Sequence, residues 1–497
     1  MAYEIVAGVN ARVGAANAPD ALHAVPREPG PLHLRSASGA ARGPTAVQWM
    51  IGIFLSLLLG VFLATALWLT LNLLHHIVFG LFALVAVARA ASAAATVSPA
   101  AAAAPQADEE LPSYTILAPL YGEPEMAAPL LRALGRLDYP KAKLQILLLL
   151  EADDEPTLAA ARFVCAKGCA EVIVCPPGRP RTKPRACNIG LQRATGELLV
   201  IYDAEDEPDP GQLREAAARF AAGPPELACL QAPLRVHHAH KVIERQFALE
   251  YAALFEIVLP ALARIDAPFP LGGTSNHFKT EALRRVGGWD AHNVTEDADL
   301  GFQLARHGYR LGVLSLPTRE TAPDRLYEWL PQRTRWIKGY MQTWGVHTRA
   351  PLELGLRNAA VLTLTVGLAI ASAFLHGPAC AWIGAQLLIW ASGGGLPDVA
   401  VLDILLLGAG WIASIGVMAV GAYRARLPMS PADGLIAPLY WSLQTLAAMH
   451  ALWQLALRPF HWDKTPHRPA PEPADRSAAE AISLAGAAHA RDLAVEG

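Results

Sequence analysis

Asp203 and Glu205 are two carboxylates separated by one residue, directly after the largely apolar run Leu199–Tyr202. If that run is a strand, both side chains point to the same side of its end. Carboxylate oxygens are the ligands that hard divalent cations take in proteins, so the pair predicts a site for Mg²⁺ or Mn²⁺. Such a cation stabilises a diphosphate leaving group. The alternative is an acidic cap for a helix that starts near Pro208–Pro210, and the pattern alone leaves both interpretations open.

Earlier segments carry groups that suit a nucleotide. Tyr121 and Glu123 follow another apolar run, and an aromatic ring and a carboxylate there would stack on and hydrogen-bond to a base. Glu151 and Asp153 close the next run and offer a second carboxylate for a uracil N–H. The segment 179–185 alternates cations with other residues, and cations suit phosphate oxygens. A solvated charged loop is the alternative for that segment.

Elements of an α/β domain position these groups. Short buried runs alternate with helical stretches, which predicts a mostly parallel sheet with its ligands at the carboxyl ends of the strands. The predicted strands are Tyr114–Pro119, Gln145–Leu150, Leu198–Tyr202 and Leu227–Gln231, and helices are predicted at Ala127–Leu137 and Gly211–Phe220. The acidic motifs fall at strand ends, which is the first sign of a catalytic site.

Composition places the rest of the chain in a membrane. Hydrophobic residues make up 53% of the 497 residues and charged residues 17%, and the apolar residues are concentrated in long blocks. The formal net charge of -3 gives no bias toward nucleic acid, and none is predicted as a partner. Arg27, Arg35 and Arg42 precede the first block and favour a cytoplasmic N-terminus.

The pattern along the chain predicts seven segments. Two spans within 46–90 are expected to turn near Asn72–His76, and C-terminal spans are expected near 357–376, 379–393, 401–422 and 435–457. Amphipathic interfacial helices are predicted at 323–355, broken at Pro331. The predicted boundaries are 1–45 for a disordered tail, 46–90 for two transmembrane helices, 91–110 for an Ala/Pro-rich linker, 111–322 for the α/β domain, 323–355 for the interfacial helices, 356–458 for three or four transmembrane helices and 459–497 for a polar cytoplasmic tail.

In this order the motifs resemble the processive family 2 glycosyltransferases, of which cellulose synthase and its bacterial relatives are the best known. The resemblance covers about residues 111–350 and rests most specifically on Thr295-Glu296-Asp297 followed by Gln332-Arg-Thr-Arg335-Trp336 before membrane spans. It implies a GT-A-type domain inserted between transmembrane helices. The usual second aspartate of the metal motif is a glutamate here, Glu205.

The resemblance also implies roles for individual residues. Asp297, beside Glu296, matches the catalytic base, although helix capping with Thr295 as N-cap is the alternative. Trp336 is expected under the acceptor sugar, or else as a membrane-interface anchor. The implied donor-binding residues are Pro119, Tyr121, Glu123, Glu151, Asp153, Lys183, Asn188 and Asp203; the acceptor and diphosphate residues are Gln332, Arg335, Trp336, Gly273 and Thr274; the metal ligands are Asp203 and Glu205. The segment Phe460–Thr465 resembles a gating segment, but a juxtamembrane anchor is the favoured interpretation.

The expected activity is therefore inverting transfer from a UDP-sugar, with UDP-glucose favoured, onto a growing β-linked glycan at the inner membrane. The catalytic domain would be cytoplasmic, with a divalent metal as cofactor and the lipid bilayer and export or regulatory proteins as partners. Three alternatives remain: a UDP-N-acetylglucosamine-using synthase, a transferase that adds one sugar to a lipid carrier, and a non-catalytic scaffold of an export complex. The donor that supports synthesis, the product length and the activity of an Asp297→Asn variant distinguish them.

Overall fold

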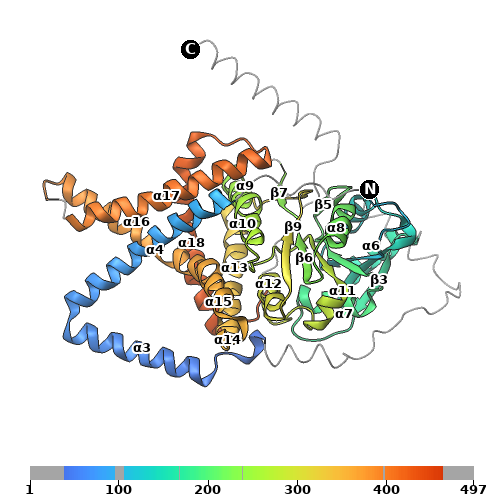
Figure 1. Cartoon of the computed structure of the whole chain (residues 1–497), viewed down its shortest axis with the longest axis horizontal. Coiled ribbons are helices and arrows are strands. Elements are labelled where there is room, and N and C mark those ends of the chain that lie inside the picture. Colours follow the sequence, from blue (N-terminus) through green and yellow to red (C-terminus); the bar gives the residue numbers. More distant parts are fainter. Residues whose placement is uncertain (1–38, 96–105, 167, 238, 396–397, 463–497) are drawn as a thin grey trace, which may run out of the picture.

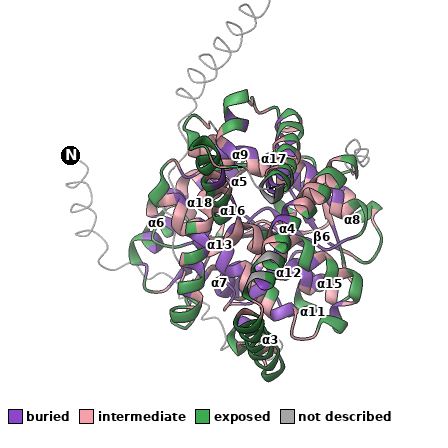
Figure 2. Cartoon of the chain, turned by 90° about the vertical axis from the view of Figure 1, so that its left-hand side faces the viewer, coloured by how far each residue is buried: buried purple, intermediate pink, exposed green. Residues whose placement is uncertain are grey.

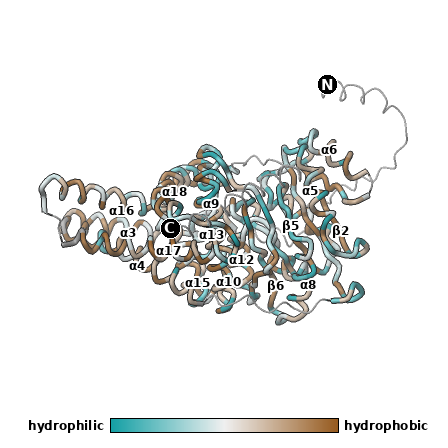
Figure 3. The backbone as a smooth tube through the Cα atoms, turned by 90° about the horizontal axis from the view of Figure 1, so that it is seen from above, coloured by the Kyte–Doolittle hydropathy of each residue, from teal (hydrophilic) through white to brown (hydrophobic). Residues whose placement is uncertain are grey.

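The computed structural model describes residues 39–95, 106–166, 168–237, 239–395 and 398–462. Residues 1–38 of the predicted tail 1–45, residues 96–105 of the predicted linker 91–110 and residues 463–497 of the predicted tail 459–497 lie outside the described residues. An α/β domain occupies one side of the molecule, and long apolar helices project from the other (Figure 1). Hydropathy follows the same division, because hydrophilic residues concentrate on the α/β domain (Figure 3).

A seven-stranded sheet forms the centre of the α/β domain, in the order β3-β2-β1-β4-β8-β6-β9. Its strands are β1 (Tyr114–Leu120), β2 (Leu144–Glu151), β3 (Glu171–Cys175), β4 (Leu198–Ile201), β6 (Leu227–Gln231), β8 (Asn276–Lys279) and β9 (Arg310–Val313). Neighbouring strands pair in parallel except at β8, which is antiparallel to β4 and β6. The mostly parallel sheet predicted from the buried runs is confirmed, and all four predicted strands are present.

Both faces of the sheet are covered by helices, which explains why its strands are apolar throughout rather than alternating. Leu117 of β1 packs in one core with α7, whereas its neighbour Ile116 packs in the opposite core with α5, α6 and α8. The covering helices are α5 (Ala127–Leu134), α6 (Glu155–Cys165), α7 (Lys183–Arg193), α8 (Gln212–Ala222), α11 (Thr280–Arg285) and α12 (Glu296–Arg306). A small second sheet in the order β5-β10-β7 joins Glu207–Pro208, Thr318–Glu320 and Leu234–Val236.

The first two apolar helices are α3 (Ala46–Thr65) and α4 (Leu67–Ala95). They meet at Ala66, so the turn predicted near Asn72–His76 is wrong. The polar residues there do not form a turn, because His75 lies within α4 and its Nε2 lies 2.8 Å from Asp403 Oδ1 of α17 (Asp398–Ala425). Near its start α3 contacts the end of the helix Leu326–His347 (Gln48 Nε2 donates to Gly345 O at 2.9 Å), but most of α3 projects away from the other helices and is exposed (Figures 1 and 2).

One continuous helical segment, Leu356–Ala391, replaces the two spans predicted at 357–376 and 379–393. It comprises α15 (Leu356–Leu362), a π-helical turn η6 (Thr363–Gly367) and α16 (Leu368–Ala391). Pro378 lies inside α16 without ending it. The Thr445 hydroxyl of a neighbouring helix accepts from Gly377 N at 3.0 Å and donates to Ala373 O at 2.8 Å, so it bridges the backbone groups of the turn just before the proline.

The predicted span 435–457 forms α18 (Pro431–Leu457), which lies along α13 (Leu326–His347). Three side-chain contacts join them along their lengths: Trp329 to Tyr440, Thr334 to His450 and Lys338 to Gln454. Within the described chain, the five helices long and apolar enough to cross a membrane are Ala46–Thr65, Leu69–Ala94, Val242–Arg264, Leu356–Ala391 and Val401–Ala425, and α18 is not among them.

The helix α13 is continuous through Pro331, so the break predicted there is wrong. Trp329, two residues before the proline, is fully buried and donates from Nε1 to the Tyr440 hydroxyl at 2.8 Å. Tertiary packing on this first half of the helix therefore outweighs the hydrogen bond that Pro331 cannot donate. The segment Val242–Arg264, made of α9 (Val242–Ala253), the π-helical turn η5 (Leu254–Val258) and α10 (Leu259–Arg264), lies between the α/β domain and α17.

Candidate active site

A cavity of about 620 Å³ opens where β1, β2 and β4 end and where α12 and α13 begin. It collects residues from seven separate stretches of the chain that the sequence analysis singled out. The predicted site residues that line it are Pro119, Tyr121, Glu123, Glu151, Lys183, Asp203, Glu205, Gly273, Thr274, Glu296, Asp297, Gln332, Arg335 and Trp336. Asp153 and Asn188 are the predicted residues that do not.

Lys183 and Asp203 form an ion pair at the floor of the cavity. The Lys183 ammonium also donates to Gly273 O at 2.6 Å, and so joins the start of α7 to the loop before β8. Burial lowers the pKa of Lys183, but the Asp203 and Glu296 carboxylates more than offset this and hold the pKa above its ordinary value. Lys183 is therefore a permanent positive charge at the end of β4.

The loop after β4 holds Asp203 in place through Asp206. Asp206 Oδ2 accepts from Asp203 N at 2.7 Å and from the Thr274 hydroxyl. Burial, and then the charges of Asp203 and Glu205, raise the pKa of Asp206 well above its ordinary value. Asp206 therefore serves as a buried hydrogen-bond acceptor that orders this loop, while Asp203 and Glu205 are the acidic residues of the loop that line the cavity.

Asp203 and Glu205 fit a hard divalent cation by the chemistry of their donors, because both carboxylates line the cavity. No group of three or more His, Cys, Asp or Glu residues that could hold a metal occurs among the described residues. The protein would therefore supply one or two carboxylates, and the remaining ligands would be phosphate oxygens and water, which is how Mg²⁺ is commonly bound with nucleotides.

Two arginines organise the side of the cavity that carries Tyr121 and Glu151. Arg181 donates to the Tyr121 hydroxyl at 2.9 Å, lies over the Tyr121 ring at 5.3 Å and pairs with Asp153 outside the cavity lining. Arg185 lies 3.3 Å from Glu151, and both side chains are buried. Burial raises the pKa of Glu151 and the Arg185 charge opposes that shift. Tyr121 and Glu151 thus face the cavity from fixed positions.

Asn188 has a different setting from the one predicted. Its side chain donates from Nδ2 to Trp289 O at 2.8 Å and accepts from Trp289 N at 2.9 Å. Both hydrogen-bonding ends of the amide are used by one backbone residue, so Asn188 ties α7 to the loop before α12. Nothing in the sequence separates this use from donor contact, because the asparagine lies only five residues after Lys183.

Glu296 and Asp297 open α12 and line the cavity. Thr295 occupies the predicted N-cap position, but its side chain makes no capping hydrogen bond. Burial raises the pKa of Asp297, while its hydrogen bond from Ala298 N and the charges of Lys183 and Arg335 oppose the shift. Burial and the charge of Asp297 raise the pKa of Glu296 to about 8. A buried carboxylate with a raised pKa is suited to accept a proton.

The Trp336 ring is held by the aromatic and cationic side chains around it. Tyr251 of α9 stacks on it with centroids 6.2 Å apart and planes at 22°, and Arg333 lies 4.7 Å from its centroid. Arg333 is paired in turn with Glu250. Trp336 lies on the cavity wall beside Tyr251, so the flat face of an acceptor sugar would meet an aromatic surface there.

Tyr251, Glu320 and the segment Phe460–Trp462 also line the cavity; the motifs did not indicate the first two, and for the third a gating role was considered but not favoured. Tyr251 lies inside an apolar helix, where nothing local marks it as different from a core residue. The segment Phe460–Trp462 follows α18, and Trp462 lies 4.5 Å from the Arg335 guanidinium. These residues line the cavity, which the favoured interpretation as a juxtamembrane anchor did not include; their aromatic side chains after an apolar block were the available signal.

The parallel sheet with carboxylates at its strand ends, and a nucleotide-sized cavity beside them, defines a GT-A-like glycosyltransferase fold. The mannosyltransferase PcManGT from Pyrobaculum calidifontis, solved with GDP-Man and Mn²⁺, has a similar structure, with a TM-score of 0.50 and 20% identity over 76% of this chain and 99% of that one. The likeness concerns the fold.

The chain belongs to the family 2 glycosyltransferases and is cellulose synthase-like. The model described as Glycosyl transferase family 2 matches residues 115–272, and Glycosyl transferase family group 2 matches residues 198–423. The chain is 26% identical to the cellulose synthase 1 catalytic subunit of Komagataeibacter xylinus, over 52% of this chain and 35% of that protein. It is 26% identical to probable glucomannan 4-beta-mannosyltransferase 10 of Arabidopsis thaliana, over 46% and 43%.

The probable glycosyltransferase YdaM of Bacillus subtilis is 25% identical, over 46% of this chain and 56% of that protein. The chain thus spans about half of the length of this relative and less of the two synthases. The predicted family is confirmed, and the chain is related to both cellulose and mannan synthases.

Proposed function

We propose that this protein transfers a sugar from a UDP-sugar, with UDP-glucose favoured, to the end of a growing β-linked glycan, and that it inverts the anomeric configuration. The observation that carries this proposal is the meeting of Asp297, Trp336 and Asp203 in one cavity from three distant parts of the chain. A base, a surface for a sugar face and a strand-end carboxylate are the three groups that a single displacement at a nucleotide sugar needs.

In the proposed reaction, Asp297 takes the proton of an acceptor hydroxyl held against Trp336. The hydroxyl oxygen then forms a bond to the anomeric carbon from the side opposite the diphosphate, and the bond between that carbon and the diphosphate oxygen breaks. Asp203 and Glu205 would hold Mg²⁺ or Mn²⁺, which stabilises charge on the departing diphosphate when bound. Lys183 and Arg335 add fixed positive charge on the same side.

We further propose that transfer is processive and coupled to export, with the protein in the inner membrane and the catalytic domain facing the cytoplasm. Supporting this are the apolar helices of the described chain and the contact of the cavity wall with a membrane-side segment, since Tyr251 lies within Val242–Arg264. A glycan leaving Trp336 would start from the side of the domain that carries the apolar helices.

Sugar transfer by the purified protein in nanodiscs with Mg²⁺ or Mn²⁺ tests the proposal. Radiolabelled UDP-glucose, UDP-N-acetylglucosamine and GDP-mannose are supplied separately, and Asp297→Asn is the control. We expect high-molecular-weight product from UDP-glucose and none from the variant. A product that stops at one sugar on a lipid contradicts processivity, and equal product from the variant contradicts the role of Asp297.

A further inference from the structure

The second half of α13 contacts the segment that carries Glu296 and Asp297 through one helical face. Gly339, Gln342, Thr343 and His347 recur at the spacing of that face. A Cβ atom at Gly339 would lie 2.2 Å from Thr295 Oγ1, so the two backbones approach as closely as a glycine allows. The first half of the same helix presents Gln332, Arg335 and Trp336 to the cavity.

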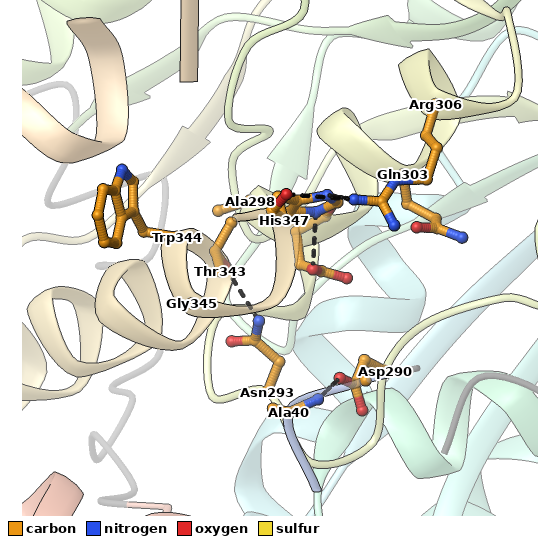
Figure 4. A network of polar contacts seen from close by, with 12 residues as sticks. Ala40, Asp290, Asn293, Ala298, Gln303, Arg306, Thr343, Trp344, Gly345 and His347 are labelled. Atoms are coloured by element: carbon orange, nitrogen blue, oxygen red, sulfur yellow. Dashed lines mark hydrogen bonds and ion pairs between the residues drawn. The ribbon is translucent and has the colours of Figure 1, made fainter. Parts of the chain in front are cut away.

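Two amide hydrogen bonds continue this contact. Gln342 Oε1 accepts from Val294 N at 3.0 Å, and Gln342 Nε2 donates to Pro459 O at 3.0 Å. Asn293 Nδ2 donates to Thr343 Oγ1 at 3.0 Å, a contact drawn in Figure 4. Each of these side chains is buried, so the bonds form away from competing water.

His347 makes the contact between α13 and α12 in which both side chains are almost fully buried. Both His347 and Asp299 are almost fully buried, and His347 Nε2 lies 3.0 Å from Asp299 Oδ1 and 3.3 Å from Asp299 O. Asp299 is two residues after Asp297 in the first turns of α12. Figure 4 shows His347 reaching across from the end of α13 to the side of α12 that also bears Arg306.

The neighbours of His347 define which ring nitrogen carries the proton. Arg306 Nη2 lies 3.3 Å from His347 Nδ1, and a guanidinium can only donate. Nδ1 must therefore accept, which assigns the ring proton to Nε2 on the side of Asp299. The other charged group beside Arg306 is Glu353 of α14 (Pro351–Leu354), at 3.6 Å. The ring is thus a fixed donor between α13 and α12.

We propose that the Asp299–His347 pair is a positioning device that sets the depth of Asp297 against the acceptor surface at Trp336. The inference rests on the proposed function, since it assumes that Asp297 is the base. Asp297 belongs to α12 and Trp336 to α13, so the distance between base and acceptor is the distance between two helices. His347, Thr343 and Gln342 determine that distance from the end of α13 beyond the cavity.

The test compares two substitutions of His347, glutamine and asparagine, whose amide groups lie one methylene apart. Glutamine places its amide N–H near the position of Nε2 and keeps the donation to Asp299, whereas asparagine reaches only the position of Nδ1 and loses it. We expect His347→Asn to lower kcat about 10- to 100-fold, since an error of about 1 Å in placing reacting groups costs on that order. We expect His347→Gln to stay within about threefold of the wild type.

The KM for the donor distinguishes a positioning role of His347 from general damage to the enzyme. Donor KM should stay near the wild-type value in both variants, because the nucleotide contacts lie on β1, β2 and the start of α7. A wild-type kcat in His347→Asn, or an equal loss in both variants, overturns the proposal. If His347→Asn does not fold, Thr343→Val removes the Asn293 contact with little change in volume and should show the same loss in kcat alone.

Measuring Asp297→Asn in the same assay distinguishes a failure of the proposed function from a failure of the positioning role of His347. An inactive Asp297→Asn with a fully active His347→Asn contradicts only the positioning role. An active Asp297→Asn contradicts the proposed function, and the positioning proposal with it.

Discussion

Replacing Gly339 with alanine tests the packing of α13 against α12. The added Cβ would lie 2.2, 2.6 and 2.7 Å from Thr295 Oγ1, Cγ2 and Cβ. Rotating the threonine side chain cannot relieve the contact with its Cβ, so one of the two backbones has to move. Restoring an ordinary contact near 3.4 Å requires a separation of the helices by about 1 Å.

That shift acts on activity more than on folding. Overpacking of this kind costs about 1–3 kcal/mol of stability, whereas a displacement of about 1 Å between reacting groups costs on the order of 100-fold in rate. Thr295 is two residues before Asp297, and Gly339 is three residues after Trp336. We therefore expect Gly339→Ala to lower kcat about 100-fold while the protein still purifies as a folded species.

Gly345 is the matched control on the same helix. A Cβ at Gly345 would meet nothing within 4 Å, and alanine is favoured over glycine inside a helix by about 1 kcal/mol. Gly345→Ala should consequently keep full activity and melt at the same or a higher temperature. Sugar transfer and melting temperature are measured for both variants in the same nanodisc preparation. A Gly339→Ala enzyme with wild-type kcat would refute the reasoning, because it would show that the spacing of the two helices does not control the reaction.

Three further outcomes are expected. Burial raises the pKa of Glu296 to about 8 from its ordinary 4.5, so between these pH values the folded protein keeps a proton that the unfolded chain has lost. The free energy of unfolding should therefore fall as pH rises from about 4.5 to about 8. Glu296→Gln should flatten the decline in melting temperature from pH 5 to 9. Trp336→Ala should raise the acceptor KM at least 10-fold with the donor KM unchanged, and an unchanged acceptor KM would remove the ring from the acceptor site. Chelation of divalent metal should abolish transfer in the wild type, and Asp203→Asn should raise the Mg²⁺ concentration needed for half-maximal rate; transfer that survives chelation would contradict metal dependence.

The sheet and the carboxylates at its strand ends could be predicted from the sequence, because both follow from local pattern. A buried parallel strand is an uninterrupted apolar run, and Asp203 and Glu205 directly follow one. The cavity then brought together the residues of seven separate motifs, which the order of those motifs had indicated by resemblance.

The errors occurred where a distant partner decides the local structure. Thr445 hydrogen-bonds to the helix backbone just before Pro378, and the Tyr440 hydroxyl accepts a hydrogen bond from Trp329 beside Pro331; neither proline ends its helix. His75 pairs with Asp403 from another helix, which is why a polar cluster is not a turn. A pattern within one segment carries no information about these partners.

The same limit applies to the site. Tyr251 and Trp462 belong to an apolar helix and to a segment far along the chain, and only the folded structure brings them beside Trp336 and Arg335. Asn188 shows the reverse case, since a polar residue near the phosphate-binding segment serves the backbone of Trp289.

The most direct test of the central claim measures two quantities in one assay: the anomeric configuration of the product, and the dependence of sugar transfer on Asp297. Labelled UDP-glucose is supplied to the purified protein, and the new linkage is read by its sensitivity to β- or α-specific glucosidases. The account predicts β-linked product from the α-linked donor, and a loss of about 10²–10⁴-fold in Asp297→Asn. An α-linked product, or transfer by the variant at the wild-type rate, would contradict it.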